Sequence, residues 1–180
     1  SLPMTDDKVE TVVKIQDGSK INFQEYFVKR GCRDQVKGVQ YKGSRSARPA
    51  NGVVESIRGS DLVMICPSNP IASIGPILSV RGIREALEKT ACPVVAISPI
   101  ISGKPLKGPA DKFMKGMGLE VSALGVAKFY EKLIDYFVLD KSDVHLDKEV
   151  KLMGIDTVIT NTVMNTLEDK VRLAEIVLKS

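Results

Sequence analysis

The sequence contains a single histidine, and this scarcity limits the chemistry that the chain can carry out. His145 stands in a polar segment with Asp143 and Asp147, which is typical of a surface residue rather than a catalytic one. Without a Ser/His/Asp set or a Cys/His pair, histidine acid–base catalysis is nearly excluded. The residues that are present favour binding and charge stabilisation over covalent catalysis.

Cysteine is also scarce, and its three copies, Cys32, Cys66 and Cys92, are scattered along the chain. Their number is odd and no metal-ligand spacing links them, so we expect neither a disulfide framework nor a zinc site. Two of them stand in or beside apolar segments that are predicted to be strands. We therefore expect reduced, mostly buried thiols in a protein of the cytosol.

Three further patterns are missing. No apolar run approaches the length of a membrane span, and no segment has the pattern of a signal peptide. No block of lysine and arginine occurs, so a nucleic-acid surface is not indicated, although a net charge of +4 leaves small anionic ligands open.

The first residue is Ser1 rather than methionine, so we expect the chain to be a portion of a longer protein.

The 180 residues fit one domain, or a fragment of one, in which two regions differ in pattern. Residues 1–60 predict a hairpin over 9–23, loops, a short edge strand near 39–41 and a helix over 51–57, while 24–30 fits a strand or a helix equally well. In residues 61–180, short apolar strands alternate with helices. The predicted strands are 62–66, 93–97, 136–139 and 157–160, and the predicted helices are 71–79, 83–89, 109–117, 122–134 and 167–179. This order predicts an α/β fold: a Rossmann-like three-layer α/β/α arrangement with a mostly parallel sheet, plus the N-terminal hairpin.

The first of these strands stops at Pro67-Ser68-Asn69-Pro70, because two prolines remove backbone donors and fix φ. Ser68, Asn69 and Ser73 then supply short polar side chains just beyond the carboxyl end of the strand. In open parallel sheets this is the edge where ligands bind. An ordinary turn with a Ser or Asn helix cap is an equally good interpretation.

The second strand also ends at a proline, in Ser98-Pro99, and leads into a loop with Gly103 and Gly108. Glycines let backbone amides approach a ligand, and the same loop carries lysines just before a helix start at Pro109. The lysines are Lys104, Lys107 and Lys112. Lysines beside a helix start favour a phosphate site, although a solvated basic loop is the alternative and the Walker pattern is absent.

Weaker candidates lie elsewhere. Asp6 and Asp7 are adjacent and would point to opposite faces of a strand, so a turn is favoured over a metal site. Arg45 and Arg48 could clamp an anion, but a solvated loop is the commoner environment for such residues. Asn161 stands at the exit of the last strand and is a weak polar-site candidate.

Five segments in order resemble the CofD family of 2-phospho-L-lactate transferases. They are Leu-Pro-Met-Thr-Asp-Asp (2–7), Phe-Gln-Glu-Tyr-Phe-Val-Lys-Arg (23–30), Pro-Ser-Asn-Pro-Ile-Ala-Ser-Ile-Gly-Pro (67–76), Ser-Pro-Ile-Ile-Ser-Gly-Lys-Pro-Leu-Lys-Gly-Pro-Ala-Asp-Lys (98–112) and Val-Ser-Ala-Leu-Gly-Val-Ala (121–127). The resemblance runs essentially from Leu2 to Ser180. A looser similarity exists to a CofD-like group, typified by a gluconeogenesis factor, whose members bind nucleotide-sugars. A non-catalytic, nucleotide-sugar-binding regulatory protein is therefore the alternative function.

The resemblance implies an activity and its partners. Such enzymes transfer 2-phospholactate from lactyl-2-diphospho-5'-guanosine to the deazaflavin Fo, giving coenzyme F420-0 and GMP, and they use Mg²⁺. The expected protein is a cytoplasmic archaeal enzyme that also binds GDP, with no nucleic-acid or membrane partner. A homodimer and an enolpyruvyl donor in place of the lactyl one stay open.

The resemblance also suggests roles for individual residues. The nucleotide would lie near Ser68, Asn69, Ser73 and Gly75, and its phosphates near Lys104, Lys107, Gly108 and Lys112. The deazaflavin would be covered by Phe23, Tyr26 and Phe27, although a role in the hydrophobic core is at least as good an interpretation of these rings.

The sequence departs from the family in one large way. Members open with a glycine-rich Gly-Gly-Thr-Gly strand and loop, followed by acidic residues that hold the metal, and neither feature occurs here. The chain resembles the carboxyl-terminal three-fifths of such a protein. We therefore expect the metal ligands to lie outside it and the 180 residues alone to be inactive.

Overall fold

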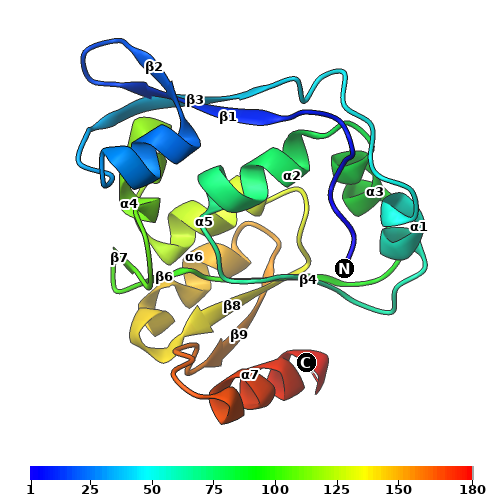
Figure 1. Cartoon of the computed structure of the whole chain (residues 1–180). Helices are drawn as coiled ribbons and strands as arrows, with labels where there is room; N and C mark the ends of the chain where they lie inside the picture. Colours follow the sequence, from blue (N-terminus) through cyan, green and yellow to red (C-terminus); the bar gives the residue numbers. More distant parts are fainter. Residues whose placement is uncertain (180) are drawn as a thin grey trace.

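A four-stranded parallel sheet forms the centre of the computed structural model, which describes residues 1–179 (Figure 1). Its strand order is β4-β5-β8-β9, and all neighbouring strands are parallel. The strands are β4 (Val63–Ile65), β5 (Val94–Ile97), β8 (Tyr136–Asp140) and β9 (Asp156–Thr160). All four residues of β5 are buried, because helices cover both faces of the sheet and leave no polar face for alternation.

The helices divide between the two faces of this sheet. Side chains of Ile65, Ala96 and Phe137 pack on one face against the larger helical layer, whereas Val95 and Val138 pack on the other face against the last helix. The helices are α1 (Val53–Arg58), α2 (Gly75–Ser79), α3 (Ile83–Lys89), α4 (Ala110–Gly116), α5 (Ala123–Tyr130), α6 (Asp147–Lys151) and α7 (Leu167–Lys179). Figure 1 shows α7 as the one helix on its side of the sheet within the described residues. The predicted three-layer α/β architecture is confirmed.

The predicted hairpin is part of a second, antiparallel sheet with the order β2-β1-β3. Its strands are β1 (Glu10–Ile15), β2 (Lys20–Asn22) and β3 (Val36–Lys42). The turn forms as the sequence indicates, because Gly18 adopts a left-handed φ of 86° and the Ser19 amide donates to the Asp17 carboxylate at 2.8 Å. We refer to residues 9–42, which contain this sheet, as the antiparallel lobe. Its buried core is Val13, Ile15, Ile21, Tyr26 and Val36, and Ile71 and Phe113 from outside the lobe pack against it.

Short irregular elements occur within both parts of the chain. The ambiguous segment 24–30 forms a π-helical turn, η1 (Glu25–Lys29), and a second π-helical turn, η2 (Pro70–Ile74), leads directly into α2. A 3₁₀ segment, η3 (Lys141–Leu146), precedes α6. The two-residue strands β6 (Ile100–Ile101) and β7 (Lys104–Pro105) form a small hairpin after β5.

Two expectations from the sequence need correction. The thiols are not mostly buried: Cys66 is exposed, while Cys32 and Cys92 are half-buried. Cys66 is exposed because it follows β4, the strand at one edge of the sheet, where the chain turns out of the core. The helix after Ser122 ends at Tyr130 rather than at residue 134, although the Ser122 hydroxyl caps it as predicted by accepting from the Gly125 amide at 3.0 Å.

His145 is exposed, as expected.

Within residues 1–179, no helix combines the length and the apolar character that crossing a bilayer would require.

Asp140 fixes the loops at the carboxyl edge of the parallel sheet. It is the last residue of β8, only 5% exposed, and its carboxylate accepts from the amides of Ser142 and Thr162, both at 2.9 Å, and from the Thr162 hydroxyl at 3.2 Å. Burial alone would raise the pKa of this carboxyl, but the hydrogen bonds outweigh burial and hold the pKa below its ordinary value.

We expect Asp140→Asn to lower the free energy of unfolding by about 1–3 kcal/mol near neutral pH, because a buried amide group would face backbone donors. The stabilisation from Asp140 is complete above the ordinary aspartate pKa of about 4 and is lost as the pH falls through the lowered pKa. The difference between variant and parent should therefore shrink in acid. Denaturant unfolding from pH 7 to pH 3 measures it.

Asp156→Asn is the control, because Asp156 is exposed. An Asp140→Asn protein as stable as this control at pH 7 would contradict the anchoring role of the carboxylate.

Candidate active site

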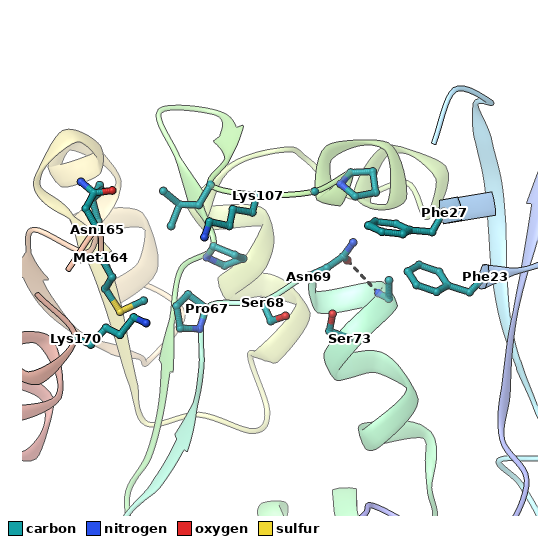
Figure 2. Close-up of a pocket in the computed structure, with 16 residues that line it drawn as sticks. Phe23, Phe27, Pro67, Ser68, Asn69, Ser73, Lys107, Met164, Asn165 and Lys170 are labelled. Atoms are coloured by element: carbon teal, nitrogen blue, oxygen red, sulfur yellow. Dashed lines mark hydrogen bonds between the residues drawn. The ribbon is translucent and has the colours of Figure 1, made fainter. Parts of the chain in front are cut away.

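A cleft of about 530 Å³ opens at the carboxyl edge of the parallel sheet (Figure 2). Loops that follow β4, β5 and β9 form it together with α7 and with residues 23 and 27 of the antiparallel lobe. It therefore lies at the edge where the sequence predicts a ligand. Its lining residues are Phe23, Phe27, Pro67, Ser68, Asn69, Ala72, Ser73, Pro99, Leu106, Lys107, Gly108, Pro109, Val163, Met164, Asn165 and Lys170.

Asn69 caps the turn that follows β4 and also faces the cleft. Its Oδ1 accepts from the backbone amides of Ile71 and Ala72, both at 3.0 Å. Figure 2 shows the amide nitrogen on the side away from the turn. The two interpretations left open for Asn69 are therefore compatible, since one oxygen is sufficient for the cap and the NH₂ group keeps its donors for a ligand.

The other predicted residues of this segment separate into two groups. Ser68 and Ser73 line the cleft beside Asn69, and Ser73 is exposed on η2. Gly75 does not line the cleft. It is buried behind the turn, where an added Cβ would lie 1.9 Å from the Tyr41 hydroxyl oxygen, so it makes room for that side chain.

The three lysines that were predicted to bind phosphate lie in different surroundings. Lys107 and Gly108 line the cleft, and Gly108 has a left-handed φ of 68° that a glycine adopts without strain. Lys104 is exposed on β7 and does not line the cleft. Lys112 lies on α4, and its Nζ donates to the carbonyl of Cys32, joining this helix to the antiparallel lobe. The hairpin of β6 and β7 and the first turn of α4 direct neighbouring lysines to different surroundings.

The aromatic residues of segment 23–30 divide in the same way. The rings of Phe23 and Phe27 stack with centroids 5.6 Å apart and planes inclined by 22°, and both line the cleft. Tyr26 is fully buried, packs edge-on against Phe113 at 5.4 Å, and donates its hydroxyl to the Asp34 carbonyl at 3.0 Å. Tyr26 is therefore part of the core, because a π-helical turn places adjacent residues on different sides.

One wall of the cleft comes from the C-terminal part of the chain and was not predicted from the sequence. Val163, Met164 and Asn165 follow β9, and Lys170 projects from α7. The strand-exit rule would have indicated the first three, because it had already led to Asn161. Asn161 itself does not line the cleft; its Oδ1 accepts from the Val163 amide at 3.1 Å. No local pattern in the sequence indicates that Lys170 lines a cleft, since it is one of several charged residues on an amphipathic helix.

The charge of the cleft suits an anion. Among residues 1–179, the side chains that line it include two lysines and no carboxylate. Two other carboxylates of this region accept hydrogen bonds from backbone amides. Asp143 accepts from the Ser102 amide at 3.0 Å, and Asp169 accepts from the amides of Asn165 and Thr166, both at 3.0 Å. The negative charges of this region thus stabilise loops outside the cleft.

The described residues do not fit a magnesium site. No group of three or more Asp, Glu, His or Cys side chains in residues 1–179 is placed to hold a metal ion. Asp7, one of the two adjacent carboxylates near the start of the chain, accepts from the Arg48 amide at 2.9 Å, and the Asp7 amide donates to the Thr5 hydroxyl, as in the predicted turn.

Comparison with known protein families and curated proteins gives consistent matches. A family model described as "2-phospho-L-lactate transferase CofD" matches residues 2–172. The 2-phospho-L-lactate transferase of Methanocaldococcus jannaschii is 44% identical over 177 residues, which are 97% of this chain and 55% of that protein. The protein of the same name from Methanococcoides burtonii is 42% identical over 167 residues, 93% of this chain and 54% of that protein. The chain thus spans about half the length of the curated relatives that it matches.

Among solved structures, two crystal structures of one Bacillus halodurans protein, described as a member of the UPF0052 family, share the fold. The superpositions have TM-scores of 0.65 and 0.60 at 18% sequence identity. They cover 98% of this chain and 61% and 60% of the Bacillus chains. At this identity the likeness concerns the fold alone.

Proposed function

The chain belongs to the CofD family of 2-phospho-L-lactate transferases, and we propose that it forms the nucleotide-binding and acceptor-binding part of an enzyme with that activity. The reaction moves 2-phospholactate from lactyl-2-diphospho-5'-guanosine to a hydroxyl of the deazaflavin Fo. A bond forms between that hydroxyl oxygen and the phosphorus of the phospholactate, the diphosphate bond breaks, and GMP leaves. The proton of the hydroxyl is lost to solvent or to a base outside the cleft lining.

One observation carries this proposal: the cleft brings together cationic, amide and aromatic side chains that match the two substrates. Lys107 and Lys170 suit the diphosphate, and the Asn69 NH₂ group suits a phosphate or guanine oxygen. The stacked Phe23 and Phe27 rings offer an apolar wall for a planar deazaflavin.

The cleft also fits the physical demands of the reaction. Attack on a phosphoryl group depends on in-line placement and on neutralising the charge of its oxygens, and it requires no covalent nucleophile from the protein. Lysines and backbone donors supply such charge stabilisation. The absence of carboxylates from the lining avoids repulsion of a diphosphate.

We expect Mg²⁺ to be held by residues of the longer family protein that this chain lacks, because the described residues do not fit it. We likewise expect the protein to act in the cytoplasm. Both statements rest on the family and on the matches to only about half of its length.

Titration of the 180-residue chain with GDP, and separately with a UDP-sugar, tests the proposal by calorimetry. Preferred binding of GDP supports the transferase function. Preferred binding of the UDP-sugar would overturn it in favour of a nucleotide-sugar-binding regulator.

Lys107→Ala should weaken GDP binding by about 1–3 kcal/mol, the loss expected for a charge-assisted contact. Lys104→Ala is the matched control: it removes the same charge from the same loop, but Lys104 lies outside the cleft. Calorimetry on both variants measures the difference. Equal affinities for the two variants would show that the loop contributes only general positive charge.

Asn69→Asp keeps the oxygen that caps η2, but it loses the NH₂ donors and adds a negative charge. We expect the free energy of unfolding to stay within about 0.5 kcal/mol of the parent, because the cap survives, and GDP affinity to fall by about 1–3 kcal/mol. Asn161→Asp is the control, since Asn161 also caps a backbone amide through Oδ1 but does not line the cleft. Unchanged GDP binding in a folded Asn69→Asp protein would reduce Asn69 to a cap.

Turnover of Fo with the synthetic guanosine donor and Mg²⁺ should be at least about 100-fold slower for this chain than for the full-length M. jannaschii relative. Loss of metal-based charge stabilisation costs several kcal/mol, and each 1.4 kcal/mol is about tenfold in rate. Comparable rates would mean that the metal ligands lie within these 180 residues.

A further inference from the structure

The hydroxyl of Tyr41 reaches from the antiparallel lobe to the turn that carries Asn69 and Ser73. Tyr41 lies on β3, opposite Thr11 of β1, and its carbonyl accepts from the Ser44 hydroxyl at 2.9 Å, so its backbone is held on both sides. Its own hydroxyl donates to the carbonyl of Ile71, at 2.5 Å. The bond joins residues 30 positions apart, one in each part of the molecule.

The Ile71 carbonyl needs this partner because of the local helix type. In η2 the carbonyl of Asn69 accepts from the amide of Ile74 at 3.1 Å, the i→i+5 pattern of a π-helix, and also from the amide of Ser73 at 3.0 Å. In that pattern the carbonyl of Ile71 would accept from residue 76, which is Pro76 and has no N–H. The Tyr41 hydroxyl takes the place of the missing backbone donor.

Gly75 makes the approach possible. A Cβ at this position would lie 1.9 Å from the Tyr41 hydroxyl oxygen and 2.7 Å from Cζ of the ring. These contacts are far too short for any side chain, so the tyrosine reaches the Ile71 carbonyl only across a residue without a Cβ. A glycine at position 75 therefore permits this hydrogen bond. Its role lies behind the cleft, where Tyr41 approaches the turn.

The hydroxyl is also a permanent donor. Burial raises the pKa of Tyr41 to about 12, so the group keeps its proton throughout the physiological range.

We propose that Tyr41 is a positioning residue that holds η2 in its π-helical form, so that Asn69 and Ser73 face the cleft together. Asn69 caps η2 and Ser73 projects from it, so the spacing of their polar groups depends on how η2 is wound. An α-helical winding would rotate Ser73 relative to Asn69, because it has fewer residues per turn than a π-helix. The effect of Tyr41 on ligand affinity rests on the proposed function, whereas its effect on η2 does not.

Hydrogen exchange without ligand tests the effect on η2 directly. Tyr41→Phe removes the hydroxyl and keeps the ring, and we expect the amides of residues 71–75 to exchange at least about fivefold faster, the factor for a hydrogen bond of about 1 kcal/mol. Tyr26→Phe is the matched control, because Tyr26 also donates to a backbone carbonyl of the antiparallel lobe, that of Asp34. Faster exchange of 71–75 in Tyr41→Phe alone supports the proposal; equal exchange in both variants overturns it.

A double-mutant cycle adds a second criterion. Gly75→Ala should displace the Tyr41 hydroxyl, so the exchange of residues 71–75 should rise as it does in Tyr41→Phe. The combined variant should show less than the sum of the two single effects, since both substitutions break the same bond, although an added Cβ at position 75 would still meet Cζ of the ring at position 41. Fully additive effects would mean that Gly75 and Tyr41 act separately, which would contradict the proposal.

GDP affinity then separates this inference from the proposed function. If the parent binds GDP, Tyr41→Phe should lower the affinity about fivefold, while Tyr26→Phe should not. If Tyr41→Phe alters the exchange of 71–75 but leaves GDP affinity at the parent value, Tyr41 does not position the binding residues and the inference fails. If the parent does not bind GDP, the proposed function fails, and the exchange data alone decide whether Tyr41 sets the winding of η2.

Discussion

Where the parallel strands end, backbone amides that no longer belong to the sheet must find other partners, and this requirement shapes the whole carboxyl edge. Short polar side chains meet it. Asn69 accepts from two amides after β4, and Ser98 accepts from the Ile100 amide at 3.2 Å after β5. Asp140 accepts from one amide after β8 and from another after β9. The loops at this edge are therefore fixed by their own side chains.

The same bonds determine the charge of the cleft. Asp140, Asp143 and Asp169 all lie at or near this edge, but their oxygens accept from backbone amides instead of pointing into the open volume. Lys107 and Lys170 remain as the ionised residues of the lining. A region of mixed charge in the sequence thus becomes a positively charged cleft in the structure, because the acidic groups are used to hold loops.

The second sheet contributes the aromatic wall of the cleft. Its lobe supplies the stacked rings of Phe23 and Phe27, and it docks through a core that includes Phe113 of α4 and Ile71 of η2. The bond from Lys112 to the Cys32 carbonyl ties the same two parts together. The position of the aromatic wall relative to Asn69 is consequently a matter of how the two sheets pack.

Local patterns in the sequence were sufficient for most of the fold and for one wall of the cleft. The apolar run at 94–97, the Asp17-Gly18-Ser19 turn, the Ser122 cap and the proline stop around Asn69 each depend on short-range sterics and hydrogen bonds, so neighbouring residues determine them. The thiol of Cys66 was misjudged because its exposure depends on β4 being an edge strand, which no local pattern records.

Only the tertiary structure decided which side chains converge. Lys104, Lys107 and Lys112 are close in sequence, yet a hairpin and a helix start send them to three different surroundings, and only Lys107 lines the cleft. Tyr26 lies in the core although Phe23 and Phe27, its neighbours in the same segment, line the cleft. Lys170 comes from α7, a helix far from these residues in the sequence. The physical reason is that side-chain direction within one element follows from the chain's own geometry, whereas convergence depends on packing between elements far apart in sequence.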